Sequence, residues 1–210
     1  MLDPGRPADA TTLAELRCDP GIEFIEDADD QREALRKLTP TPDPGLVDEP
    51  TRLAYYPWRR AVIAVLGCGV LPTVATGPER SSHHRGGAAR LGRLRVGVIG
   101  LGVGHAVAHT LAAQGLCGEL RLSDFDELEL SNLNRVPATV FDQGVNKAIV
   151  AARRIAELDP CLLVSVDTAG VTPASVDGFW TDWMSSSRSA TPWMRRSWCA
   201  KVPAEQAFRC

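Results

Sequence analysis

Three glycines after a short apolar run are the first residues in this chain whose spacing suggests chemistry. The stretch "RVGVIGLGVGHAVAHTL", residues 95–111, passes through Gly100, Gly102 and Gly104 into a helical pattern. Glycines at such a junction let an anion approach the main chain, and the free N–H groups of a helix start favour negative charge. The spacing predicts a phosphate-binding loop, although the dinucleotide pattern GxGxxG would place its third glycine at His105. We expect His105 either to touch phosphate or to lie in solvent.

An acidic residue stands where a nucleotide-binding βα unit carries the group that bonds a ribose. Asp124 ends the second predicted strand, "GELRLSDFD", and lies 24 residues after Gly100. A carboxylate at this distance typically accepts hydrogen bonds from ribose hydroxyls. The alternative is a strand-end carboxylate in water.

The elements that must position these residues alternate between strand and helix patterns. Strands are predicted over 94–99, 118–126 and 161–166, and helices over 103–114 and 144–158. Such alternation predicts a parallel sheet whose strands are connected by helices. The expected fold class is α/β, a Rossmann-like parallel sheet that is incomplete at about three strands, with irregular N-terminal and C-terminal segments.

Two segments after the second strand make the pattern more specific. "DFDELELSNLNRV" and "FDQGVNKA" contain Asp124, Asp126, Ser131, Asn132, Leu133 and Arg135, then Gly144, Lys147 and Ala148, followed by "LDP". These residues resemble the ThiF/MoeB/ubiquitin-activating-enzyme superfamily of adenylyltransferases. Members carry a glycine-rich loop, a D-x-D-x-(hydrophobic)-x-x-S-N-L-x-R segment and a G-x-x-K-A helix start. The order and spacing agree over residues 94–168.

The resemblance implies both a reaction and a set of site residues. It implies that Asp124 binds the ribose of ATP, and that Asn132, Arg135 and Lys147 hold the triphosphate. The implied nucleotide-binding set is Gly100, Gly102, Gly104, Asp124, Asp126, Asn132, Arg135 and Lys147, with Arg135 and Lys147 as the catalytic residues. A substrate carboxylate would attack the α-phosphorus, giving an acyl-adenylate and pyrophosphate, with ATP and Mg²⁺ as cofactors. Such chemistry needs positioned cations more than acid–base groups.

The chain departs from the family pattern at several places. The loop "GLGVGH" lacks one glycine of the common GxGGxG form. The arginine-containing segment usually found before the first strand is not visible. The downstream aspartate and "TD" or "CD" pair that follow the family's fourth strand and help to hold Mg²⁺-ATP are also absent. The zinc and transfer cysteines of some members are also missing, and no metal-ligating residue is assigned.

Composition excludes several other classes of protein. A net charge of −3 over 210 residues argues against a general nucleic-acid or membrane-surface binder. The sequence has neither a membrane-length apolar run nor a signal peptide, so we expect a cytoplasmic protein. The six cysteines contain no CxxC pair, and neither a zinc ribbon nor a disulfide framework is expected. His83 and His84 are not expected to bind metal.

Composition also divides the chain into four parts. Residues 1–66 form an acidic, helical N-terminal segment, with helices predicted over 27–38 and 57–67. Residues 67–90 are an irregular linker, 91–178 the N-terminal half of the ThiF-type nucleotide-binding domain, and 179–210 an irregular tail.

The two irregular segments suggest shifted reading frames. "WMSSSRS" in the tail is what a valine-rich strand becomes when its codons are read out of frame. We hypothesise that residues after about 179, and those from about 68 to 90, are frameshift products. A truncated three-stranded sheet cannot bury both faces, so the chain as written is expected to be marginally stable and inactive. Resequencing the coding DNA tests this hypothesis.

The preferred interpretation is an ATP-dependent adenylyltransferase-like domain, of the ubiquitin-like modifier-activating type, that activates a carboxylate. The implied partner is the C-terminus of a ubiquitin-like or sulfur-carrier protein, or a small carboxylate, and the family suggests a homodimer. Two alternatives stay open. One is a non-catalytic nucleotide-binding module, and the other is an NAD-dependent oxidoreductase.

Overall fold

The computed structural model describes residues 1–39, 42–68 and 94–185. The chain divides into two compact units. The N-terminal unit comprises Met1–Leu91, Ala113–Leu116 and Ala156–Cys161. The parallel-sheet unit comprises Gly92–Ala112, Cys117–Ile155 and Leu162–Cys210. The segments for which we hypothesised a frameshift lie mostly in 69–93 and 186–210, outside the described residues.

The N-terminal unit is built on a small mixed sheet. Its elements are α1 (Pro7–Cys18), β1 (Glu23–Ile25), α2 (Ala28–Arg36), α3 (Pro44–Val47), β2 (Arg52–Tyr56), the 3-10 helix η1 (Pro57–Arg59) and β3 (Ala61–Val65). The strand order is β1-β3-β2, with β3 parallel to β1 and antiparallel to β2. The prediction of a helix over 27–38 is confirmed by α2. The prediction of an irregular N-terminal segment is wrong, because a regular sheet forms here.

The helix predicted over residues 57–67 is also wrong. Pro57 opens only a short 3-10 turn, and Arg60 ends it with a left-handed backbone, φ 51°. The next five residues, "AVIAV", form the central strand β3, in which Val62 is fully buried. Three of these residues are β-branched, which favours a strand, and pairing on both edges of β3 decides the outcome.

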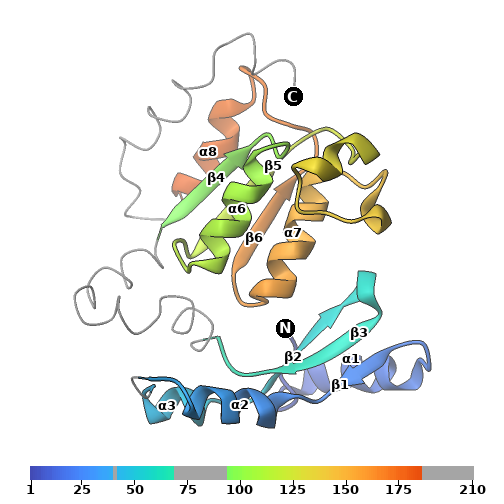
Figure 1. Ribbon diagram of the computed structural model, residues 1–210, viewed down its shortest axis with the longest axis vertical. Helices are drawn as coiled ribbons and strands as arrows, with labels where there is room; N and C mark the ends of the chain where they lie inside the picture. Colours follow the sequence, from blue (N-terminus) through green and yellow to red (C-terminus); the bar gives the residue numbers. More distant parts are fainter. Residues whose placement is uncertain (40–41, 69–93, 186–210) are drawn as a thin grey trace. The chain divides into compact units, whose positions relative to one another are not determined.

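The parallel-sheet unit has the fold predicted from the sequence (Figure 1). Its elements are β4 (Arg95–Ile99), α6 (Gly104–Ala113), β5 (Glu119–Ser123), the 3-10 helices η2 (Leu130–Asn134) and η3 (Val140–Asp142), α7 (Lys147–Leu158), β6 (Leu163–Asp167) and α8 (Val176–Ser185). The strands are parallel in the order β4-β5-β6. The α/β, Rossmann-like, three-stranded fold class is therefore confirmed.

The two faces of this sheet are covered by different helices. Helices α6 and α7 pack on one face (Figure 1), where Val98, Leu120 and Leu122 join Ala108 and Ile155 in the core. Helix α8 lies on the other face. A Cβ at Gly97 would come within 2.4 Å of the Trp180 ring, so a glycine in β4 is what allows α8 to approach.

Helix α8 crosses the boundary at 178/179 that we predicted between domain and tail. Its start is fixed by Thr172 and Ser175, because the Ser175 N–H donates to Thr172 Oγ1 at 3.2 Å and Thr172 N–H donates to Ser175 Oγ at 2.8 Å. Phe179 is buried, and Arg121 of β5 both lies over its ring and donates to its carbonyl oxygen. The expectation of no regular structure after residue 179 is therefore wrong as far as Ser185.

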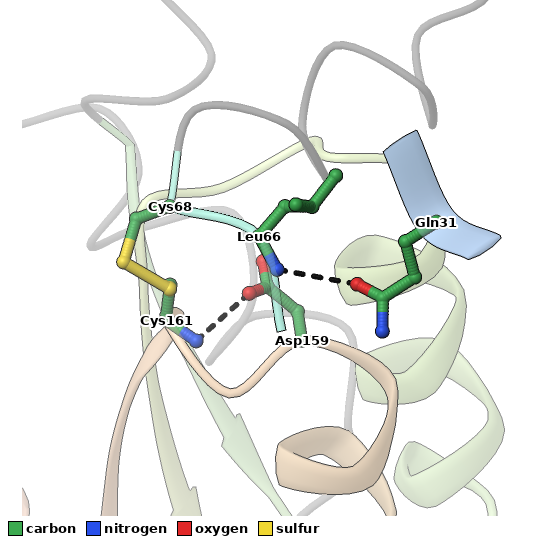
Figure 2. The surroundings of a disulfide bond; sticks show 5 residues. All are labelled: Gln31, Leu66, Cys68, Asp159 and Cys161. Carbon is green, nitrogen blue, oxygen red and sulfur yellow. Dashed lines mark hydrogen bonds between the residues drawn. A yellow bond between two sulfur atoms is a disulfide. The ribbon is translucent and has the colours of Figure 1, made fainter. Parts of the chain in front are cut away.

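A disulfide joins Cys68 and Cys161, both in the N-terminal unit, with their Cα atoms 5.4 Å apart (Figure 2). Beside it, the Leu66 N–H donates to Gln31 Oε1 at 3.2 Å, and the Cys161 N–H donates to Asp159 Oδ1 at 2.9 Å. The expectation that no disulfide forms is wrong for this pair. A separation of 93 residues gives no local spacing from which the pairing could be recognised.

None of the helices within the described ranges is both long and apolar enough to cross a bilayer.

Candidate functional site

The glycine loop joins the end of β4 to the start of α6. Gly100 has a φ of +79°, and its N–H donates to Ser123 O at the end of the neighbouring strand, at 2.9 Å. A Cβ at Gly104 would lie 2.7 Å from Val98 Cγ1, so this glycine allows the helix to start close to the sheet. Gly102 stands between them, and its missing Cβ would point into open space. Glycine is therefore required at two positions of the loop for its backbone conformation and packing, while phosphate binding by the loop stays a prediction.

Asp124 follows the neighbouring strand β5 and is almost fully buried, with 4% of its surface exposed. Its Oδ2 accepts from Leu101 N in the glycine loop at 2.5 Å, and its Oδ1 accepts from Asp126 N at 2.8 Å. Both carboxylate oxygens therefore bond main-chain N–H groups. Asp124 fixes the shape of the glycine loop, which the sequence argument did not anticipate.

Asp126 and Lys147 form an ion pair that joins the end of β5 to the start of α7. Lys147 Nζ lies 2.8 Å from Asp126 Oδ2, and the Lys147 main-chain N–H donates to Asp126 O at 2.9 Å. Two further main-chain hydrogen bonds join the same segments. The Leu128 N–H donates to Val145 O at 2.8 Å, and the Gly144 N–H donates to Leu128 O at 2.9 Å. The ion pair with Asp126 compensates for the burial of Lys147, of whose surface only 8% is exposed.

The S-N-L-x-R motif forms the 3-10 helix η2 and the residue after it. Asn132 is buried, and its Oδ1 accepts from Glu129 N at 3.2 Å, so its side chain caps its own helix. Arg135 is exposed, and its Nη1 donates to Ser131 O at 3.3 Å and to Asn134 Oδ1 at 3.0 Å. One motif residue therefore shapes the turn, while the other keeps its guanidinium at the surface.

A pocket of about 600 Å³ lies where these segments meet. Its lining is Gly102, Val103, Asp126, Glu127, Leu128, Glu129, Leu130, Asn132, Arg135, Gln143, Gly144 and Lys147. The structure thus brings together Gly102, Asp126, Asn132, Arg135 and Lys147 of the predicted set. Gly100, Gly104 and Asp124 lie beside the pocket without lining it. This volume falls in the range of small-molecule sites, and the pocket sits beyond the carboxyl ends of the strands.

The charges in the pocket come from two cations and three carboxylates. Lys147 and Arg135 face Asp126, Glu127 and Glu129. In the part of the chain that the structure describes, no group of three or more His, Cys, Asp or Glu side chains could hold a metal ion. Asp126 is paired with Lys147, so these residues form no dedicated Mg²⁺ cage. The side chains of Lys147 and Arg135 are the pocket-lining groups that could bond phosphate oxygens.

His105, in the first turn of α6, is neither in solvent nor in the pocket. It is fully buried, and neither ring nitrogen has a hydrogen-bond partner among the described residues. Burial is the main cause that lowers the pKa of His105 to about 4; His109 and Arg154 act in the same direction, and Asp142 opposes them. Both expectations for His105 are therefore wrong. The chain buries this imidazole in its neutral form.

Asp142 and Arg154 form a second buried ion pair that holds η3 against α7. Arg154 Nη2 lies 2.5 Å from Asp142 Oδ2, and Thr139 donates to the same oxygen through its N–H and its hydroxyl. Burial raises the pKa of Asp142, but the hydrogen bonds from Thr139 and Arg154 outweigh it and lower the pKa overall.

Sequence reasoning missed several residues of this region, among them Gln143 of the pocket lining. Glu127 and Glu129 line the pocket, and Asn146 bonds Asp124 O through its side chain at 2.8 Å. The signal for Asn146 was present, because asparagine directly before an amphipathic helix is a favoured N-cap. The two glutamates stand at positions of the D-x-D-x-(hydrophobic)-x-x-S-N-L-x-R segment for which the motif specifies no residue type.

Known proteins similar to this chain include a protein family and two curated relatives. A family model described as "ThiF family" matches residues 80–185, about half of the chain. An uncharacterized protein of Mycobacterium tuberculosis (strain CDC 1551 / Oshkosh) is 54% identical over 171 residues, covering 81% of this chain and 24% of that protein. Ubiquitin-like modifier-activating enzyme 5 of Drosophila willistoni is 34% identical over 103 residues, covering 49% of this chain and 25% of the enzyme.

Among solved structures, the tRNA N6-threonylcarbamoyladenosine dehydratase TcdA of E. coli, in complex with ATP, is 29% identical with a TM-score of 0.48. The match covers 51% of this chain and 45% of that one. The chain spans about a quarter of the length of the curated relatives it matches.

Proposed function

Because this chain belongs to the ThiF family, we propose that its parallel-sheet unit binds ATP and transfers the adenylyl group to a carboxylate. The products are an acyl-adenylate and pyrophosphate. The bond between the α-phosphorus and the α,β-bridging oxygen breaks, and pyrophosphate leaves with that oxygen, as the bond from the carboxylate oxygen to the α-phosphorus forms. The reaction needs no proton transfer between its reacting groups, so the side chains required are those that bind and stabilise anions.

The observation that carries this proposal is the convergence of Lys147 and Arg135 on a pocket edged by Gly102. The first N–H groups of α6 follow that glycine, and a helix start favours phosphate. Two cations next to these N–H groups make a site for several phosphate oxygens at once. Asn132 holds the turn that carries Arg135, which makes it a structural member of the same site.

Within the proposal, Lys147 has a defined role during nucleotide binding. Its ammonium is already bonded to Asp126, so phosphate has to share or displace that carboxylate. A lysine retains three donors, and one ion pair leaves the others to bond phosphate oxygens. Arg135, which is exposed at the rim, adds a second positive charge as negative charge develops at the α-phosphorus.

The proposed acceptor is the C-terminal carboxylate of a ubiquitin-like or sulfur-carrier protein, or a small carboxylate. The relative from Drosophila willistoni supports the first class through its name, ubiquitin-like modifier-activating enzyme 5. A homodimer and a cytoplasmic location remain parts of the same proposal, as does Mg²⁺ as the companion of ATP.

The test is ATP–pyrophosphate exchange by the full chain, with peptides ending in Gly-Gly and with small carboxylates as acceptors. Calorimetric titration with ATP alone runs in parallel. The proposal predicts ATP binding, and exchange that depends on the acceptor and is lost in Lys147→Met. Fluorescence enhancement of NADH with no binding of ATP would contradict it and favour an oxidoreductase.

The second candidate is a nucleotide-binding module without chemistry. The observation in its favour is that Asp126 already neutralises the one buried lysine that lines the pocket. ATP binding that is saturable, with no exchange for any acceptor of the panel, would favour this module over the adenylyltransferase.

A further inference from the structure

Asn146, directly before Lys147, bonds two segments with one side chain. Its Oδ1 accepts from Ala148 N at 2.9 Å and from Ile149 N at 3.4 Å, which caps the start of α7. Its Nδ2 donates to Asp124 O at 2.8 Å. We propose that Asn146 is a positioning residue of the nucleotide site, which sets the spacing between the glycine loop and Lys147. This inference rests on the proposed binding of ATP.

The chemistry of the amide explains why this position carries more than a helix cap. A cap requires only an acceptor oxygen, which serine, threonine or aspartate supplies as well as asparagine. The bond to Asp124 O requires a donor at the same time. Asparagine carries its acceptor and its donor on two separate atoms, whereas serine and threonine would have to use one oxygen for both bonds, and aspartate has no donor when ionised. The bonds that Asn146 accepts from Ala148 N and Ile149 N cap α7, whereas the bond that it donates to Asp124 O plays no part in capping the helix.

The second bond closes a chain of contacts from the loop to the lysine. Leu101 in the glycine loop bonds the carboxylate of Asp124, and Asn146 bonds the carbonyl oxygen of the same Asp124. Lys147 follows Asn146 and bonds Asp126, both through its main chain and through its ammonium. The phosphate-binding N–H groups and the phosphate-binding cation are thus held at a fixed separation through Asp124 and Asn146.

If only the bond from Asn146 to Asp124 O is broken, we expect the separation between the glycine loop and Lys147 to be less well fixed. Asn146→Ser and Asn146→Asp both keep an oxygen that caps α7, and both lose the amide donor. One variant is neutral and the other acidic, so a loss common to both cannot come from added charge. Ser175→Ala is the matched control, because it removes a bond at the start of α8 in the same unit without touching the pocket.

The first measurement is the Kd for ATP by calorimetry on the full chain. We expect Asn146→Ser and Asn146→Asp each to raise the Kd about fivefold to tenfold, the size of one lost neutral hydrogen bond. Ser175→Ala should stay within about twofold of the wild type at a similar or larger loss of Tm. A Kd within about twofold of the wild type in both Asn146 variants overturns the inference.

The second measurement does not depend on the nucleotide. Amide hydrogen exchange at Lys147, whose N–H bonds Asp126 O, should be about fivefold faster in both Asn146 variants and unchanged in Ser175→Ala. Equal exchange in the variants and the wild type overturns the inference whether or not ATP binds. A wild type that binds no ATP defeats the proposed function, while the exchange experiment still decides whether Asn146 fixes Lys147.

Discussion

The two units differ in what they bury. Every buried polar side chain within the described residues belongs to the parallel-sheet unit: His105, Ser123, Asp124, Asn132, Asp142 and Lys147. The buried residues of the N-terminal unit are apolar or aromatic. Ion pairs such as Lys37–Glu33 lie at its surface, with exposed fractions of 72% and 62%.

The buried polar side chains show that the parallel-sheet unit is the part of the chain in which desolvation of polar groups opposes folding. Burying a polar group is unfavourable unless its hydrogen bonds are replaced, and burying a charge is worse. Asp124, Asn132 and Lys147 meet that requirement with main-chain and ionic partners at the carboxyl ends of the strands. His105 is the exception, because neither of its ring nitrogens has a hydrogen-bond partner among the described residues. Buried polar groups that are fully hydrogen-bonded are typical of a binding site, whereas a scaffold needs only an apolar core and surface ion pairs.

The largest expected effect is on the apolar core beneath the site. Leu122 is fully buried in the core shared by the sheet, α6 and α7. We expect Leu122→Ala to lower the free energy of unfolding by about 4 kcal/mol, through lost burial and a cavity. Urea titration followed by circular dichroism measures it. Leu163→Ala, at a side chain that is 67% exposed, is the control, and a loss under about 1 kcal/mol in Leu122→Ala would contradict this packing.

The next effect is a loss of stability at acidic pH that arises from His105. Its folded-state pKa of about 4 is below the ordinary value of 6.5, so the unfolded chain takes up this proton first. Stability is unaffected above pH 6.5 and falls by about 3 kcal/mol as the pH drops to 4. His105→Leu should remove that part of the pH dependence. Parallel stability curves for the variant and the wild type between pH 7 and 4 would be inconsistent with a buried neutral imidazole.

A smaller effect is expected from the buried pair of Arg154 and Asp142. Arg154→Met leaves the carboxylate of Asp142 buried without its guanidinium, and we expect a loss of about 2 kcal/mol. The pKa of Asp142 should rise at the same time, since one of the groups that lower it is gone. Thermal unfolding together with NMR titration of Asp142 measures both quantities. An unchanged Tm would mean that the comparison between the units fails at this pair.

The smallest effect belongs to the N-terminal unit. Lys37→Met breaks an exposed pair with Glu33, and the stability should change by no more than about 0.5 kcal/mol. Urea titration under the conditions used for Arg154→Met gives the comparison. A loss as large as that of Arg154→Met would remove the distinction between surface and buried ion pairs.

Regular periodicity decided which part of the fold could be predicted. The strands and helices of the parallel-sheet unit carry long apolar patterns with glycines at their junctions, and β4, α6, β5, α7 and β6 formed as predicted. The family resemblance built on the same residues is confirmed by the family match. Residues 57–67 were wrong because a run such as "RRAVIAVL" fits a short helix or a buried strand equally well. Only the flanking partners β1 and β2 decide between them.

The sequence indicated several residues that line the pocket, but not how their side chains are arranged. The family motifs singled out Asp126, Asn132, Arg135 and Lys147, and the structure places all four in the lining of one pocket. Their role in nucleotide binding stays a prediction. Spacing could not reveal that Asp124 turns its carboxylate to Leu101 N, because this depends on the path of the glycine loop. It could not reveal the burial of His105 either, since burial depends on which residues pack over a helix start.

The central claim is that the pocket binds the triphosphate of ATP through Lys147, and one titration tests it most directly. Calorimetry with ATP should be run on the wild type, on Lys147→Met and on Lys37→Met, which removes one lysine of the other unit. We predict a Kd for ATP at least about thirtyfold weaker in Lys147→Met and unchanged in Lys37→Met, with both variants folded by circular dichroism. Equal affinity for ATP in all three proteins would contradict the account.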